Sequence, residues 1–377
     1  MSTLTGDESA LLRGIRDDPD DDVRRLVYAD WLEENGRAEH AELIRVQLAL
    51  EKGPRKKKDL EQREEALIGR LRATWPASIA DAGVIYRRGL GVARWQGFAG
   101  FEEGARRLVA AGPPPWVVEC ELKIEAYGRQ DSDFRELAGS PNFALLTRLE
   151  IDWSEFLTLE TAQAIGSSPH AAGLRDLTLH RMNLGDKGAA ALAKGALRGL
   201  RRLDLAGSAL GAKGVARIAN SATFGELLHL SLPWCVEDEA SLVALTQATG
   251  LPRLRVLYLT GNKIGDARLR RLLKSPILAH LEELVLAGNT IRDNGAKALA
   301  ACAALAGLRS LNLNGNQIGE AGAQALLESP HLTSLEEIDL QWQLKISQET
   351  LGRLHKRFRG RKRKAARVLP IPFRGVQ

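Results

Sequence analysis

A period of 27 residues constrains the fold of this chain more than any other feature of its sequence. Six segments open with a leucine at this constant step, at Leu200, Leu227, Leu254, Leu281, Leu308 and Leu335. Two further segments precede them, at Leu146 and Leu174, and a weaker copy begins at Glu119. A period that holds from residue 119 to residue 346 predicts a stack of similar units rather than one globular core.

Each segment follows one pattern of apolar residues, of which LRVLYLTGNKIG from Leu254 is an example. Counting the opening leucine as position 1, positions 4 and 6 alternate as the buried side of a short strand does. The second half of each unit, such as GAAALAKGAL, has helical spacing. The pattern LxxLxLxxN/CxL is the leucine-rich repeat, and the unit resembles the ribonuclease-inhibitor type. This resemblance implies an α/β fold: a curved solenoid with parallel strands on the concave side and helices on the convex side.

Position 9 of the repeat predicts a ladder of buried polar side chains. Asn262, Asn289 and Asn316 occupy this position in three successive repeats. A buried amide there can bond backbone groups of its own turn and of the next one. Met182 cannot donate a hydrogen bond, so we expect a regular ladder only from about residue 262 to residue 316. We interpret Cys235 as a buried thiol of the same ladder.

The first 50 residues lack this period and predict helices, including Val23 to Glu34 and Ala38 to Glu51. The stretch ALLRGIRDDPDDDVRRLVYADWLEENGRAEHAELIRVQLAL resembles the bacterial repeat-companion domain, a short module that precedes repeats. The stretch YRRGLGVARW, from Tyr86 to Trp95, resembles the segment that leads into the repeats of such proteins. The resemblance implies an organisation for the chain and no activity.

The Asp30-Trp31 pair in this module allows two interpretations. An aromatic ring beside an acid on an amphipathic helix usually packs, while the acid faces water or caps a neighbour. The alternative is a docking surface whose rim is formed by Tyr28, Asp30, Glu33 and Glu34. Local unfolding of a Trp31→Ala protein would support packing, and loss of a partner without unfolding would support docking.

The domain organisation follows from changes in composition. Gly53-Pro54 ends the helical module, and a charged helix that follows is expected to act as a linker. Leu351, Leu354 and Phe358 have the spacing of a capping helix, which a solenoid needs at its end. We therefore predict a helical repeat-companion module, a charged helical linker, an irregular N-terminal cap, the leucine-rich repeats, and a capping helix with a basic tail, over residues 1–52, 53–80, 81–118, 119–350 and 351–377.

Charge is distributed unevenly along the 377 residues. The first 50 residues contain twelve Asp/Glu and six Lys/Arg, whereas residues 353–377 contain ten Lys/Arg and no Asp/Glu. This end of the chain could bind phosphates, which would make the protein nucleic-acid-associated. No aromatic residue lies within the cluster to stack on bases, so we treat this function as the alternative. The candidate phosphate-binding residues are Arg359, Arg361, Lys362, Arg363 and Lys364.

No signature of catalysis, of a cofactor or of a metal site is apparent in the sequence. Phosphate-binding loops, zinc-protease motifs, nucleophile elbows and Cys-x-x-Cys pairs are all missing. Three widely spaced cysteines and no apolar run of membrane-spanning length or secretory signal favour a cytoplasmic protein. We therefore expect no enzymatic activity, no cofactor, no membrane association and no small-molecule substrate.

Binding to another protein is the function that the repeats favour. Positions 2, 3, 5, 7 and 8 are expected to project from the concave face, where aromatic and arginine residues are typical of binding hot spots. Trp234 and Tyr258, in neighbouring repeats, could share one pocket, or their rings could be buried against adjacent strands. We predict a scaffold or adaptor that binds a protein partner on this face, while the N-terminal module caps the stack or binds a second partner. The candidate binding residues are Trp153, His180, Arg181, Trp234, Tyr258 and Trp342.

Overall fold

The computed structural model describes residues 6–17, 21–53, 57–75, 79, 82–111, 116–125, 130–152, 158–343 and 346–358. These residues divide into two compact units. Residues 6–93 and 107–119 form the N-terminal unit, and residues 94–106 and 120–358 form the repeat unit. Strands β2 (Leu90–Gln96) and β3 (Val117–Glu125) each contain residues of both units.

The N-terminal unit contains α1 (Gly6–Asp17), α2 (Asp22–Glu34), α3 (Ala38–Glu51), α4 (Lys57–Ala73) and a hairpin of β1 (Val84–Arg87) with β2. The Asp21 carboxylate accepts the Val23 N–H at 2.8 Å and caps α2. This helix is followed by Asn35 and by Gly36, which has a φ of 76°. The two predicted helices of the module are therefore confirmed, with one more residue at the start of the first.

Helix α4 covers part of the segment that we predicted to be a linker, and it packs on α3. Arg63 donates to Glu42 at 2.6 Å, and Gln47 of α3 donates to Glu64 at 2.6 Å. Leu67 of α4 is fully buried with Leu43 of α3. Residues 57–73 thus belong to the compact N-terminal unit.

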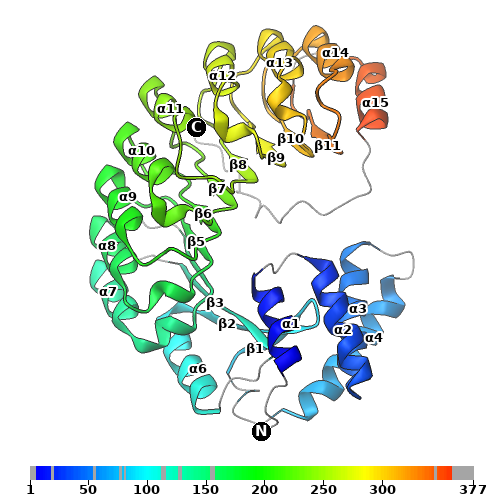
Figure 1. Ribbon diagram of the computed structural model, residues 1–377, viewed down its shortest axis with the longest axis vertical. Coiled ribbons are helices and arrows are strands. Elements are labelled where there is room, and N and C mark those ends of the chain that lie inside the picture. The colour runs from blue at the N-terminus through cyan, green and yellow to red at the C-terminus, as the bar shows by residue number, and fades with distance from the viewer. Residues whose placement is uncertain are drawn as a thin grey trace. The chain divides into compact units, whose positions relative to one another are not determined.

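The repeat unit is organised around parallel strands that follow one another in chain order (Figure 1). Each strand pairs with the strand of the next repeat so that residues at equivalent positions lie side by side. Leu257, for example, lies beside both Leu230 and Leu284. After β3 come β4 (Arg148–Asp152), β5 (Asp176–Leu179), β6 (Arg202–Asp204), β7 (His229–Ser231), β8 (Val256–Tyr258), β9 (Glu283–Val285), β10 (Ser310–Asn312) and β11 (Glu337–Asp339).

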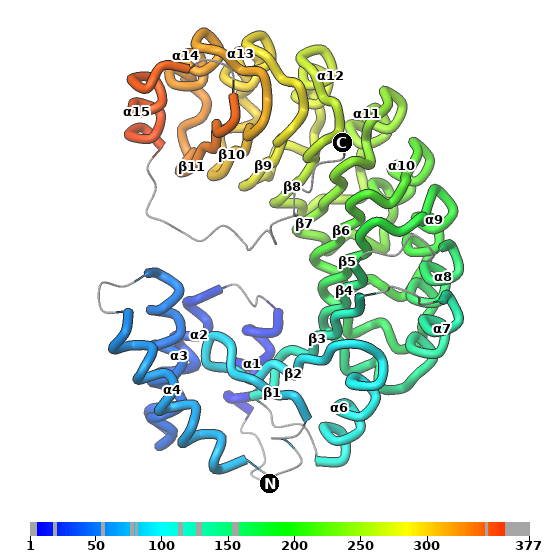
Figure 2. Tube along the Cα trace, turned by 180° about the vertical axis from the view of Figure 1, so that it is seen from behind, coloured from blue at the N-terminus to red at the C-terminus, as the bar shows by residue number. Residues whose placement is uncertain are grey.

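Helices cover the other side of this sheet, so the repeat unit is a curved leucine-rich-repeat solenoid, with strands inside its arc and helices outside (Figures 1 and 2). The helices are α6 (Gly97–Ala111), of which residues 97–106 belong to this unit, α7 (Asp131–Gly139), α8 (Leu159–Ser167), α9 (Gly185–Lys194), α10 (Ala212–Asn220), α11 (Glu239–Thr246), α12 (Asp266–Leu272), α13 (Asp293–Ala300), α14 (Glu320–Glu328) and α15 (Gln348–Arg357). Short 3-10 turns precede several strands, at Pro141–Leu145, Ala171–Gly173, Ala222–Phe224, Pro276–Leu278 and Ala303–Leu305.

Leucines at positions 4 and 6 form the core of each repeat. Leu257 and Leu259 are fully buried, as are Leu284 and Leu286 one repeat later. Burial of each such side chain contributes about 1.5–3 kcal/mol before the entropy of ordering the chain is counted.

Position 9 forms the predicted ladder, but its bonds point in the opposite direction. The Asn289 side chain accepts the N–H groups of Asn262 and Ile264 and donates to the Leu259 carbonyl at 2.7 Å. These three partners belong to the preceding turn, so our expectation of bonds to the next turn is wrong. The expected bond to its own turn is present, because Asn289 also donates to the Ala287 carbonyl at 3.1 Å.

The donor half of this ladder is also longer than the predicted range of 262 to 316. Successive residues at position 9 each donate to the carbonyl of the position-6 leucine one repeat earlier. The pairs are Ser208–Leu179, Cys235–Leu205, Asn262–Leu232, Asn289–Leu259, Asn316–Leu286 and Gln343–Leu313. Burial raises the pKa of the Cys235 thiol to about 11, in keeping with its interpretation as a buried ladder thiol.

Polar side chains also join the helices of successive repeats. A serine after a helix donates its hydroxyl to a carbonyl near the end of the preceding helix, as in Ser168–Ala138, Ser221–Ala193, Ser275–Thr246 and Ser329–Ala300. At the other end, an acid of one repeat accepts backbone N–H groups where the next helix begins. Asp186 accepts those of Gly211 and Gly214, at 2.9 and 2.7 Å.

The last repeat is covered by α15, as the spacing of its apolar residues predicts. Leu354 and Phe358 are buried, and Leu351 is half-buried. Arg357 donates to the carbonyl of Ser329 at 2.6 Å, which fixes the end of α15 beside the end of α14. Within the described ranges, no helix has both the length and the apolar character that crossing a membrane requires.

Candidate functional site

The concave face of the repeat unit consists of the side chains at positions 3, 5 and 7 of strands β3 to β11. In β5, Leu177 and Leu179 point into the core and are fully buried, whereas Asp176 and Thr178 are half-buried on the other side. The in-register pairing places equivalent positions of neighbouring repeats next to one another, about 4.8 Å apart. Residues at the same position of successive repeats therefore form continuous rows on this face.

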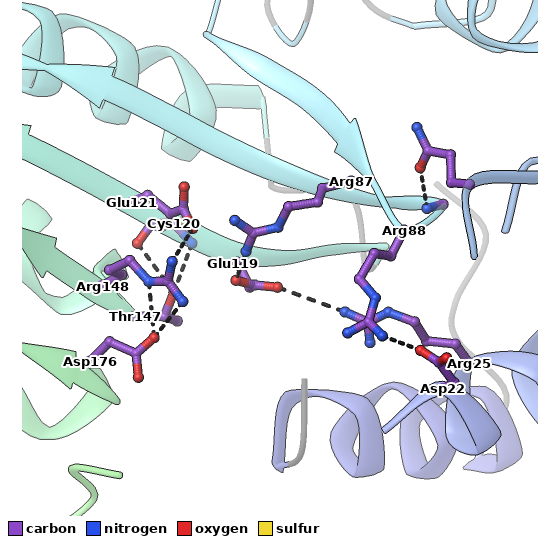
Figure 3. Close-up of polar contacts among 12 residues, drawn as sticks. Asp22, Arg25, Arg87, Arg88, Glu119, Cys120, Glu121, Thr147, Arg148 and Asp176 are labelled. Carbon is purple, nitrogen blue, oxygen red and sulfur yellow. Dashed lines mark hydrogen bonds and ion pairs between the residues drawn. The ribbon is translucent and has the colours of Figure 1, made fainter. Parts of the chain in front are cut away.

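Position 3 forms a row of alternating charges on the first strands. Arg148 lies between two carboxylates, 3.3 Å from Glu121 and 2.5 Å from Asp176 (Figure 3). The row continues to Arg202, whose Nε is 3.8 Å from Asp176, and begins at Arg94, whose Nε is 3.0 Å from Glu121. At position 5, Lys123 pairs with Glu150 at 2.5 Å. Acids and bases therefore pair with one another over β3 to β6, where six acids face three Lys/Arg and His180 at positions 3, 5 and 7.

His180 occupies position 7 between two carboxylates. Its Nδ1 is 3.7 Å from Asp152, and its Nε2 is 3.2 Å from Asp204. Burial opposes the charged ring, but the interactions with Asp152 and Asp204 outweigh burial and raise the pKa of His180 to about 10. His180 is therefore an imidazolium at neutral pH, which ties this position to the strands on either side.

A second polar group lies on β7 to β9. The His229 ring packs edge-on against Tyr258, with ring centres 4.6 Å apart, and the Tyr258 hydroxyl donates to Glu283 at 2.6 Å. Burial, together with Arg202, lowers the pKa of His229 well below its usual range, so this ring is neutral. Burial raises the pKa of Glu283, and the nearby charge of Glu337 raises it further, whereas Tyr258 and Arg202 oppose the shift.

Position 8, just after each strand, requires a left-handed backbone. Glycine fulfils this requirement at residues 207, 261, 288 and 315, with φ of 64–70°. Arg181, Trp234 and Trp342 adopt the same conformation with φ of 52°, 54° and 55°. This backbone is unusual for bulky residues and costs roughly 1–2 kcal/mol for each of them.

The two tryptophans at position 8 have different surroundings. The Trp234 ring lies on the backbone of Gly261, where an added Cβ would be 2.2 Å from the indole Nε1. Trp342 lies in the turn after the last described strand, β11, and is 81% exposed. Trp153 lies outside the described residues. Trp234 and Tyr258 do not share a pocket. Tyr258 is buried against His229, and the Trp234 ring packs on Gly261.

The candidate docking surface on the N-terminal unit is only partly exposed. Tyr28 is fully buried and donates its hydroxyl to Glu8 at 2.9 Å, so it cannot form the rim that we expected. The Trp31 ring stacks on Tyr28 at 6.0 Å and carries the Arg37 guanidinium 4.9 Å above it. These contacts favour the packing interpretation of the Asp30-Trp31 pair.

The acids of that candidate surface remain accessible. Asp30 and Glu33 both pair with Arg45, at 2.7 and 2.6 Å, and Glu34 is exposed. The same helix exposes three apolar side chains at helical spacing. They are Val23, Leu26 and Val27.

The N-terminal unit also contains an aromatic hollow of about 660 Å³, which no pattern in the sequence predicted. Trp75 and Tyr86 each stack on Trp116, with ring centres 5.2 and 5.5 Å apart. Burial lowers the pKa of His40, which also lines the hollow, to about 4. The hollow is lined by Gly36, Arg37, Ala38, Glu39, His40, Leu71, Thr74, Trp75, Tyr86 and Trp116.

Two remaining predictions concern the basic tail and metals. Arg359, Arg361, Lys362, Arg363 and Lys364 lie outside the described residues, so phosphate binding by this segment stays a prediction. In the part of the chain that the structure describes, no three His, Cys, Asp or Glu side chains gather closely enough to hold a metal ion.

Comparisons with known proteins identify the repeat. A family model for the leucine-rich repeat matches residues 278–300 and 308–327. No curated protein matches the chain. A solved structure of the yeast Rad7 and Elc1 complex is similar at 18% identity and a TM-score of 0.47, covering 63% of this chain and 60% of the other. A solved Bacteroides fragilis protein is similar at 16% identity and a TM-score of 0.46, covering 78% and 86%. The chain thus spans less than two thirds of the yeast protein chain that it matches.

Proposed function

We propose that this protein is a scaffold or adaptor without catalytic activity, and that the concave face of its repeats binds a protein partner. The observation that carries the proposal is the strained backbone at position 8. Arg181, Trp234 and Trp342 hold a conformation that four other repeats assign to glycine. Strain of this kind persists at binding sites because the side chain that it positions has a use there.

The identity of these residues supports a protein ligand. Tryptophan and arginine are the residue types that contribute most to protein interfaces. Trp342 in particular gains little from folding, because most of its surface stays in water. A partner that covers this ring would recover the apolar contact that the fold itself does not make.

The charge of the concave face supports a protein rather than a nucleic acid as its ligand. Its described positions 3, 5 and 7 contain nine carboxylates, three Lys/Arg and the charged His180. A phosphate backbone would be repelled by this excess of negative charge. The acids are Glu121, Glu125, Glu150, Asp152, Asp176, Asp204, Glu283, Glu337 and Asp339, and the bases are Lys123, Arg148 and Arg202.

We further propose that the protein works in the cytoplasm. The three cysteines Cys120, Cys235 and Cys302 are free thiols. A reducing compartment keeps such thiols unpaired. The relation of the N-terminal unit to the bacterial repeat-companion domain, and a second partner bound by that unit, are part of the same proposal.

Site-specific photo-crosslinking in cells tests this function. A photoreactive amino acid at Asn314 stands on the concave face, and the same group at Lys297 stands on an outer helix of the adjoining repeat. The hydrogen bonds of Asn314 are made by its backbone N–H and carbonyl, which the substitution keeps. We expect a discrete protein crosslink from position 314 and none from position 297. Equal crosslinking from both positions, or none from 314, would contradict the proposal.

A further inference from the structure

The second half of the concave face, on β7 to β11, has an uncompensated charge. At positions 3, 5 and 7 of these strands, the described residues include Glu283, Glu337 and Asp339 but no lysine or arginine. On β3 to β6, by contrast, each of the two arginines at position 3 lies beside at least one acid. The fold thus leaves one stretch of this sheet face with acids that it does not neutralise by its own strand residues.

The electrostatics of Glu283 show the effect of that imbalance. Its carboxyl pKa is raised by burial and by Glu337, which stands two strands away in the same row. Two carboxylates that disfavour each other's charge become more stable when a cation approaches both. A ligand with positive charge is therefore favoured over this row.

Two other residues of this half suit a cationic side chain. Trp342 exposes its ring at the end of β11, and guanidinium groups stack well on an indole face. His229, at position 3 of β7, is 6% exposed and neutral, and its Nδ1 has no hydrogen-bond partner among the described residues. That nitrogen is itself buried, so a ligand does not reach it, but the neutral ring does not repel an approaching cation.

The dimensions of the surface favour an extended ligand. The row from β9 to β11 spans about 10 Å, because neighbouring strands are about 4.8 Å apart. An extended chain advances about 3.3 Å per residue, so two alternate side chains, about 6.6 Å apart, fit within this span.

We propose that the concave face of β7 to β11, with Trp342 at its end, binds a basic, extended segment of a partner protein. The proposal rests on the proposed function and names the chemistry of the partner. Arginine or lysine side chains of the segment pair with Glu283, Glu337 and Asp339, and one of them stacks on Trp342. The paired charges of β3 to β6 position the rest of the partner and contribute less to the specificity for that partner.

Fluorescence anisotropy with the full chain tests this assignment, with a labelled peptide of alternating arginine and serine as the probe. A peptide of alternating glutamate and serine is the mock ligand. The test variant is Glu337→Lys/Asp339→Lys, and Glu337→Gln/Trp342→Ala is a milder variant that keeps the Asp339 contacts to the β11 turn. The matched control is Glu136→Lys/Glu328→Lys, which places the same charge change on exposed residues of α7 and α14.

We expect the wild-type chain to bind the arginine peptide, more weakly as salt rises, and not the glutamate peptide. The double reversal should weaken binding at least about tenfold, the milder variant should weaken it several-fold, and the control should not change it. Equal binding by the wild type and by both test variants, or no binding at low salt, would overturn the assignment.

A chain that lacks residues 359–377 tests the competing occupant, which is the chain's own basic end. We expect this deletion to leave peptide affinity unchanged. An increase of about tenfold or more would assign the surface to the chain's own segment and would overturn a partner as its occupant. If the arginine peptide does not bind but position 314 still crosslinks to a protein, only the proposal of a basic segment is rejected. If the crosslink is also absent, the proposed function itself is rejected.

Discussion

The two halves of the repeat unit satisfy their polar groups in different places. Strands β3 to β6 pair their charges on the surface, where Arg148 and His180 each join two carboxylates. Strands β7 to β11 have few such pairs on the concave face but have the most regular interior, in which Asn262, Asn289 and Asn316 bond successive turns. The concave side chains of β7 to β11 contribute little to the stability of the fold and are therefore available for a ligand. This difference from β3 to β6 is the basis of the proposed binding surface.

The largest expected effect comes from the interior of the second half. Asn289→Ala removes four side-chain hydrogen bonds and leaves buried backbone groups of Asn262, Ile264 and Leu259 unsatisfied. We expect the free energy of unfolding to fall by about 3 kcal/mol, measured by equilibrium unfolding in urea. Asn294→Ala, on the exposed side of α13, is the control and should change stability by less than about 0.5 kcal/mol. Similar losses for the two variants would mean that the ladder does not stabilise this half.

The next effect concerns His180 and pH. Its pKa is about 10 in the folded protein and about 6.5 in an unfolded chain, so its contribution is complete below about pH 6.5 and is lost as pH rises through about 10. We expect the stability of the wild type relative to His180→Gln to fall by about 2 kcal/mol over that range. Urea unfolding at several pH values measures this difference, with His280→Gln, an exposed loop position, as the control. A difference that stays constant with pH would refute the charged ring.

A smaller effect separates the surfaces of the two halves. Arg148→Ala removes the cation between Glu121 and Asp176, which lie on the strands on either side of it, and we expect a loss of about 1 kcal/mol because the guanidinium is partly screened by water. Glu337→Ala removes an exposed acid of the unpaired half, and we expect no loss beyond about 0.3 kcal/mol. Thermal unfolding of both variants provides the comparison. A larger loss for Glu337→Ala would show that this half also depends on its surface charges.

The smallest effect distinguishes the two tryptophans of position 8. Trp342→Gly removes a strained, largely exposed side chain, so the relief of strain and the higher entropy of the unfolded chain should nearly cancel, within about 0.5 kcal/mol. Trp234→Gly also removes the contact of the ring with Gly261, and we expect a loss of about 1.5 kcal/mol. Calorimetric unfolding of the two variants tests the contrast, and an equal loss would assign Trp342 to the fold.

The period of 27 residues was sufficient to predict the solenoid, its strands and its helices, because each repeat contains the same alternation of buried leucines. It could not predict the direction of the Asn ladder. That direction depends on which neighbouring turn lies within 3 Å of the amide, and an amide can bond on either side. Ser208, Cys235 and Gln343 joined the ladder because one donor to the position-6 carbonyl is enough, whatever its chemistry.

The candidate site was predicted in part. The sequence placed His180, Arg181 and Tyr258 on the concave face, but their partners come from other repeats. Asp204 and His229 went unnoticed because each is separated by roughly one repeat from its partner, His180 or Tyr258. The alternation of charge at position 3 likewise appears only when that position is compared from one repeat to the next. The strain at Trp342 could be read in the same way, since other repeats have glycine at that position.

The aromatic hollow of the N-terminal unit was missed for a different reason. Trp75, Tyr86 and Trp116 come from separate elements with no periodic relation, so nothing in their spacing predicts that their rings meet. Tyr28 was misjudged because its hydroxyl has a buried partner, Glu8, on another helix, and nothing in the spacing of the two residues predicts that they meet.

Reversing the charge of the protein surface and of the peptide ligand tests the central claim most directly. The affinities of the wild type and of Glu337→Lys/Asp339→Lys would be measured for both the arginine and the glutamate peptides. We expect the wild type to prefer the arginine peptide and the double reversal to prefer the glutamate peptide, because the charge of β11 selects the ligand. The same preference in both proteins would show that the ligand binds elsewhere, and the division of the concave face into a paired half and a binding half would be wrong.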